Sequence, residues 1–240
     1  MKDSASLDFN TGIDIVYSAA DDSYTLTDRN GSHVPFTPAD IVPSDPGIGG
    51  VKYRIDVPNN VFSHTDFTRF VPKVNGVPLS YTLMGIWHQD YGQVIDVMVG
   101  GVPTQAGNLP TSGSAIYQAA VVSGAALTSG AGNSPVISYD LGSGGSTATF
   151  SADFGPGTVQ TTIGLRGMDS KGATNDLGTL TGDGTISATA PTFAGTLSQA
   201  GGSGAFSGAF LGPQAAEMGY GFYFESADFT AIGLVAGKKK

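Results

Sequence analysis

The chain has 240 residues, enough for one large β domain or two small ones that bury their own cores. Its formal net charge of −9 argues against nucleic acid, because a phosphate-binding surface needs clustered Lys and Arg. The chain has no cysteine, which excludes disulfides, thiolate metal sites and Cys nucleophiles. Its 36 glycines, its 13% of charged residues and its short runs of Val, Ile, Phe and Tyr predict an all-β protein.

The N-terminal part alternates apolar and polar residues in short runs joined by turns. Residues 13–17 and 24–27 flank the turn Asp21-Asp22-Ser23 and predict a β-hairpin. Residues 37–50 are rich in Pro, Gly, Asp and Ser and predict a loop. Residues 51–57 alternate again and predict a half-buried strand.

The next segments differ in regularity. Residues 61–70 carry aromatic side chains that follow neither a helical nor a strand period, so this stretch is predicted to be irregular. Residues 79–89 and 93–100 are rich in β-forming residues, and 90–92 has the chemistry of a hairpin turn. These two runs are therefore predicted to be adjacent antiparallel strands.

The texture of the sequence changes between residues 100 and 113, where Pro103, Pro110 and several glycines predict a linker. Beyond it, β-rich runs recur at the spacing of a meander. These runs cover 114–127, 136–141, 146–154, 158–168, 178–188, 192–199, 205–211 and the residues from Tyr220 onward. Small residues on one face would let the strands curl around a filled interior. The prediction is an N-terminal antiparallel sheet over 1–108 and an eight-stranded antiparallel β-barrel over 109–240, although an open sandwich fits the same pattern.

Three stretches resemble the transferrin-binding-protein family of surface lipoproteins. Residues 204–222 are similar to its G-x-F-x-G-x-F-x-G-P-x-A-x-E-x-G-G-x-F stretch, except that Tyr220 stands where the family more often has Gly. Residues 79–87 resemble its Y-x-x-x-G-x-W strand, and 100–104 contain its G-x-x-T turn. Residues 109–117 resemble the M-P-x-x-G-x-A-x-Y stretch that leads into its barrel. The order and separation of these stretches agree with the family.

This resemblance implies a handle domain beside the barrel, in a lipoprotein displayed on or secreted from the outer membrane of a Gram-negative bacterium. The only membrane contact would then be a lipid on a cysteine that precedes the mature domain. The implied function is nutrient capture and not catalysis: the protein would bind haem or a host iron protein and pass the cargo to a TonB-dependent outer-membrane receptor. The alternatives are an adhesive surface protein without cargo and a carrier of a non-haem small molecule.

The three histidines, His33, His64 and His88, have no metal-binding spacing such as an i, i+4 pair. His88 follows Trp87 on a predicted strand, and His64 lies among aromatic residues. An imidazole beside apolar rings is what a haem site needs, because the nitrogen binds iron and the rings cover the porphyrin. The candidate haem site is His64, His88, Trp87, Tyr91, Phe62 and Phe67, with the two histidines as candidate iron ligands. For each histidine, a surface or packed position is the alternative.

The sequence shows no catalytic constellation. The many serines include no Gly-x-Ser-x-Gly elbow between a strand and a helix, and the glycine-rich stretches lack the Lys-Ser/Thr of a phosphate loop. Binding is therefore expected to fall to loops on a rigid scaffold, and the expected binding loops are residues 37–50 and 61–73.

Overall fold

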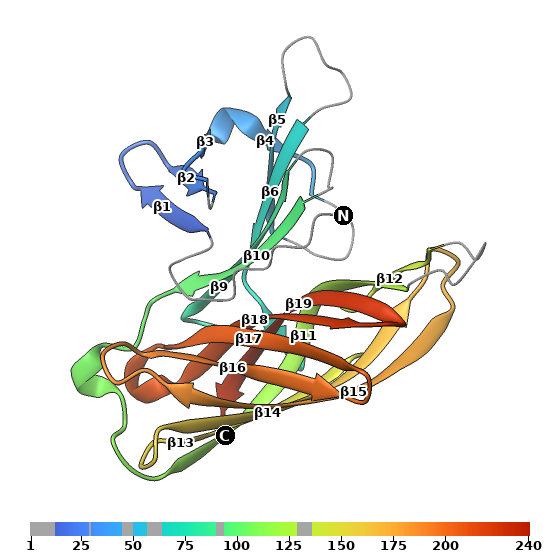
Figure 1. The fold of residues 1–240 in the computed structure, drawn as a ribbon. Helices are drawn as coiled ribbons and strands as arrows, with labels where there is room; N and C mark the ends of the chain where they lie inside the picture. Colours follow the sequence, from blue (N-terminus) through green and yellow to red (C-terminus); the bar gives the residue numbers. More distant parts are fainter. Residues whose placement is uncertain (1–12, 29, 45–49, 57–63, 90–93, 129–135) are drawn as a thin grey trace.

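The computed structural model describes residues 13–28, 30–44, 50–56, 64–89, 94–128 and 136–240. In these ranges the regular elements are β-strands and short 3-10 helices, as Figure 1 shows, and the predicted all-β class is confirmed. No helix in the described part of the chain is long and apolar enough to cross a membrane.

The N-terminal part, which we call the handle, contains two main antiparallel sheets. The first has the strands β1 (Asp14–Ser18), β2 (Ser23–Thr27) and β3 (His33–Phe36), and its β1–β2 hairpin was predicted. The second has the order β10-β9-β6-β5-β4, with β4 (Ile41–Val42), β5 (Val51–Asp56), β6 (His64–Phe70), β9 (Thr82–Gln89) and β10 (Val94–Gly101). Two smaller elements complete the handle, the 3-10 helix η1 (Pro38–Asp40) and the hairpin β7 (Lys73–Val74) and β8 (Val77–Pro78). The described part of the loop predicted over 37–50 therefore contains η1 and β4.

Strand β6 corrects one prediction. Residues 64–70 were expected to be irregular, yet they form the central strand of the five-stranded sheet. The pattern misled because both faces of this strand are covered: Phe67 packs under the first sheet, and Asp66 is buried among charged partners on the other face. A strand covered on both faces need not alternate apolar with polar residues. The binding loop expected over 61–73 is thus largely strand, and residues 61–63 lie outside the described ranges.

The C-terminal part is a closed ring of eight antiparallel strands, because the last strand pairs back with the first. The ring consists of β11 (Ser114–Thr128), β13 (Thr147–Asp153), β14 (Thr158–Met168), β15 (Thr174–Ile186), β16 (Thr192–Gln199), β17 (Gly202–Leu211), β18 (Glu217–Ser226) and β19 (Phe229–Lys239). The predicted eight-stranded barrel is confirmed.

Its strands are not all the expected ones. The run predicted over 136–141 is the short strand β12 (Ser138–Asp140), which pairs with β11 and β14 outside the ring. The run from Tyr220 is two strands, β18 and β19. The turn between them was missed because it has no glycine or proline: the Ser226 hydroxyl accepts the amides of Asp228 and Phe229 instead.

Aromatic rings fill the interior of the barrel, so the barrel is a packed core. The ring centroid of Phe193 lies 4.9 Å from those of Phe150 and Phe210. Tyr220, where the chain departs from the family motif, is fully buried among them, and its hydroxyl lies 2.6 Å from the Thr161 hydroxyl. Burial raises the pKa of Tyr220, so the phenol stays protonated.

One face of the five-stranded sheet packs on the outer wall of the barrel. Met84 and Ile86 of β9 share a buried cluster with Leu234 and Ala236 of β19. Gly219 of β18 lets the two parts approach closely, since a Cβ there would lie 2.8 Å from Val99 Cγ1 and 3.0 Å from Met84 Cε. The barrel wall therefore holds β9 and β10, and with them the centre of the handle, in a fixed position.

Candidate functional site

The two histidines of the predicted haem site lie on the sheet face that includes the barrel contact. His88 in β9 stands directly opposite Asp66 in β6, and His64 begins β6 two residues before Asp66. The His64 Nε2 atom lies 3.7 Å from the Asp66 Oδ2 atom. Both histidines are thus beside one buried carboxylate.

Asp66 is 6% exposed and forms an ion-pair cluster with cations of β5. Arg54 holds both carboxylate oxygens at 2.7 Å, and Lys52 Nζ lies 3.2 Å from Oδ2. Burial alone would raise the pKa of Asp66, but the hydrogen bonds and charges of Arg54 and Lys52 outweigh burial and hold the pKa below its usual value. Within the described residues, no three His, Cys, Asp or Glu side chains are grouped to hold a metal ion. The cluster is accounted for as a structural ion pair.

Trp87 and Phe67 lie on the opposite face of the sheet from the histidines. They are cross-strand partners, each 1% exposed, and they pack under the first sheet of the handle. The Trp87 indole donates to the Thr65 hydroxyl at 2.7 Å. Because successive side chains of a strand point to opposite faces, the sheet separates these rings from the histidines. Phe62 and Tyr91 lie outside the described residues, and haem binding through the histidines stays a prediction.

A pocket of about 360 Å³ opens on the Trp87 face, between the β1–β2 hairpin and the strands β6, β9 and β10. Its apolar walls include Phe67, Leu83 and Met98. Gly85 and Gly100 leave neighbouring strands without side chains there, and a Cβ on Gly100 would meet no atom within 4 Å. The volume lies in the range of roughly 300–1,000 Å³ that is usual for small-molecule sites.

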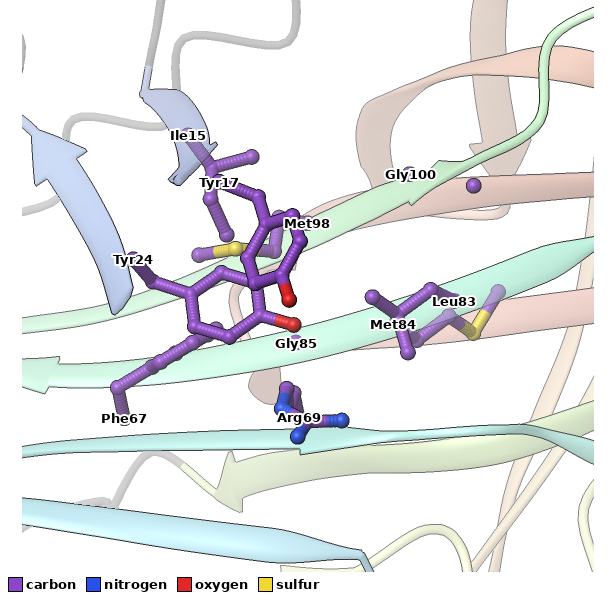
Figure 2. Close-up of a pocket in the computed structure, with 11 residues that line it drawn as sticks. Ile15, Tyr17, Tyr24, Phe67, Arg69, Leu83, Met84, Gly85, Met98 and Gly100 are labelled. Atoms are coloured by element: carbon purple, nitrogen blue, oxygen red, sulfur yellow. The ribbon is translucent and has the colours of Figure 1, made fainter. Parts of the chain in front are cut away.

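Three polar side chains of the lining come from three different strands. Figure 2 shows the Tyr17 and Tyr24 rings over one side of the pocket, with their hydroxyls directed into it, and Arg69 of β6 below them. The two tyrosine ring centroids are 4.9 Å apart, and the Arg69 Cζ atom lies 5.2 Å from the centre of the Tyr24 ring. The Arg69 Nε atom donates to the Tyr53 hydroxyl at 3.2 Å. The pocket thus joins an apolar hollow to two hydroxyls and one cation.

The protonation states of these groups follow from their contacts. The hydrogen bond from the Tyr17 hydroxyl to Asp22, 3.0 Å long, raises the pKa of Tyr17, and burial raises that of Tyr24. Burial would lower the pKa of Arg69, but the hydrogen bond to Tyr53 and nearby tyrosines outweigh burial and raise it. The pocket therefore presents two neutral phenols and a permanent guanidinium cation.

Sequence reasoning missed Tyr17, Tyr24 and Arg69 as site residues. They are separated along the chain and belong to strands, whereas binding was expected in loops. The signal that could have found them is the glycine at the middle of one predicted strand, Gly85, beside the glycine pair that ends the next. Glycine inside a strand often marks a close approach or a ligand.

The protein-family model that matches the chain describes the C-lobe and N-lobe beta barrels of Tf-binding protein B. It matches residues 109–239, more than half of the 240-residue chain. The chain belongs to this family. The matched residues hold the eight-stranded ring with the motifs that lead into it and precede its last strand, so the predicted family is confirmed.

Solved structures show the same fold at low identity. Transferrin binding protein B of serogroup B Neisseria meningitidis is 19% identical with a TM-score of 0.51, over 86% of this chain and 38% of that one. HpuA of Kingella denitrificans, in complex with human haemoglobin, is 14% identical with a TM-score of 0.49, over 99% of this chain and 89% of that one. The chain thus spans well under half the length of the Neisseria protein. No curated protein sequence matches the chain.

Proposed function

We propose that this protein captures haem at the surface of a Gram-negative bacterium and passes it to a TonB-dependent outer-membrane receptor. The observation that carries the proposal is the handle pocket, where two hydroxyls and a guanidinium converge on an apolar hollow. Such convergence is typical of a small-molecule site. An adhesive protein without cargo is expected instead to present a broad aromatic patch and no hollow.

Membership of a family described by transferrin binding supports a role in iron acquisition. The packed barrel acts as the rigid support, and the handle makes the ligand contacts. Catalysis is not part of the proposal, since the polar groups of the described lining are two phenols with raised pKa values and a guanidinium. None of these is poised as a general base near neutral pH.

Haem would enter with its flat apolar face against the tyrosine rings. Tyr17 is 51% exposed, so its hydroxyl is accessible from solvent, and a tyrosine oxygen is one of the ligands that haem iron takes in proteins. The histidines on the other face of the sheet offer a rival position for the iron. The two positions can be separated by variants, because the sheet lies between them.

The test is a visible-absorption titration of haem into the purified protein. The wild type is expected to give a sharp, stoichiometric Soret shift. Gly100→Phe is expected to abolish the shift by filling the pocket, since nothing stands within 4 Å of a Cβ there. A shift that survives in Gly100→Phe but is lost in His64→Ala or His88→Ala would move the site to the other face. No shift in the wild type would end the haem proposal.

A further inference from the structure

We infer that the handle pocket selects ligands that carry a carboxylate on a flat, apolar body, and that Arg69 is the residue that recognises the acid group. This inference rests on the proposed function, because it names the ligand chemistry of the same pocket.

The charge of the pocket carries the first step. Arg69 is the one charged side chain among the described residues that line it. The carboxylate of Asp22 stands behind the lining, where it accepts the Tyr17 hydroxyl at 3.0 Å. A ligand in the hollow therefore faces a cation and two phenol groups, which favours an anion over a neutral or cationic molecule.

The hydrogen-bonding groups of Arg69 carry the second step. Its Nε–H donates to the Tyr53 hydroxyl, and one face of the guanidinium lies over the Tyr24 ring. Neither Nη atom has a hydrogen-bond partner in the described part of the chain. A guanidinium fixed through Nε and its face, with N–H groups left over, is prepared to take the two oxygens of a carboxylate.

The shape of the pocket carries the third step. Gly85 and Gly100 lie on adjacent strands and form a floor without side chains, and Met98 borders it. The Tyr17 and Tyr24 rings stand over this floor, as Figure 2 shows. A planar ring can contact the floor, the rings and the Met98 thioether at once. A flat body with an acid group at its edge therefore matches both the shape and the charge of the site.

The experiment compares each acid with its neutral analogue. Pyrenecarboxylate is set against pyrenemethanol, and protoporphyrin IX against its dimethyl ester, with quenching of Trp87 fluorescence as the readout. Trp87 is the single tryptophan of the chain and its side chain lies in the handle core. In the wild type the acid of a pair is expected to bind about tenfold more tightly than its neutral analogue, the worth of one charge-assisted hydrogen bond.

Two variants test the role of Arg69. Arg69→Met is expected to abolish the preference for the acid while the neutral analogue still binds, and Arg69→Lys to retain part of it. Arg166→Met, an exposed arginine on barrel strand β14, is the matched control and should change nothing. Equal affinities for acid and neutral analogue in the wild type would overturn the inference and leave the pocket as a binding site. Equal losses of both in Arg69→Met would show a structural role and overturn it too. Binding of none of the four probes would overturn this inference and the proposed function together.

Discussion

Glu217 of the barrel accepts a hydrogen bond from Thr82 of the handle, with 2.9 Å between Glu217 Oε2 and Thr82 Oγ1, across 135 residues of sequence. The same carboxylate accepts the backbone amides of Ser80 at 2.7 Å and Tyr81 at 2.9 Å, and it is 2% exposed. Glu217 is the glutamate of the family motif. Its place in the motif is thus explained by the start of strand β9, which it fixes to the barrel.

Glu217→Gln is expected to destabilise the protein by about 2 kcal/mol, because the new amide group presents donors to buried donors. The measurement is urea unfolding followed by Trp87 fluorescence, which reports on the handle. Glu225→Gln is the matched control on the same strand, where the glutamate is exposed, and an effect below about 0.5 kcal/mol is expected. Equal effects of the two variants would contradict the role given to Glu217.

Gly219→Val tests the close packing of the handle on the barrel. A Cβ at this position would approach Val99 Cγ1 to 2.8 Å, so the handle must shift outward. Overpacking of this kind costs about 1–3 kcal/mol. The variant is expected to be cut faster by protease near the exposed Val102, between handle and barrel. Gly155→Val, where the nearest atom is 3.6 Å away on a flexible side chain, should be cut at the wild-type rate.

Asp66→Asn removes the anion of the buried ion-pair cluster. The expected loss at neutral pH is about 2 kcal/mol, below the roughly 3–5 kcal/mol of a fully buried pair, because the Arg54 side chain is 36% exposed. The pKa of Asp66 is depressed in the folded protein, so its contribution is complete above the ordinary value of 3.8 and is lost as pH falls through the lower, folded-state pKa. The difference in stability between wild type and Asp66→Asn should therefore be constant above pH 5 to 6 and shrink below about pH 4. A difference that stays the same in acid would contradict the ion pair.

Tyr220 shows how this chain departs from its family's motif. Tyr220→Phe is expected to cost about 1 kcal/mol, because one buried hydrogen bond to Thr161 is lost while Thr161 still donates to the Thr149 carbonyl. Tyr220→Gly restores the family's residue but empties the core, and its expected cost is about 3–5 kcal/mol. Thermal unfolding of the two variants checks this order. A more stable Tyr220→Gly protein would mean that the ring is not needed to fill the barrel.

The barrel was predictable because its information is local. Strands such as 158–168 and 192–199 alternate and end at turns, and their bounds match the structure. Strand β6 could not be found this way, since Asp66 is buried only because Arg54 and Lys52 arrive from another strand. The pocket was beyond reach for the same reason. Tyr17, Tyr24 and Arg69 meet through the pairing and stacking of two sheets, which no spacing along the chain encodes.

The most direct test of the central claim, that the handle pocket takes the cargo, is backbone hydrogen exchange with and without saturating haem. Strands β1 and β2 cover only the pocket face of the five-stranded sheet, so they distinguish the pocket from the histidine face. The account predicts slower exchange in β1 and β2 on haem addition, and no such change in Gly100→Phe. Unchanged exchange in β1 and β2, with protection around His64 and Lys52 instead, would contradict it.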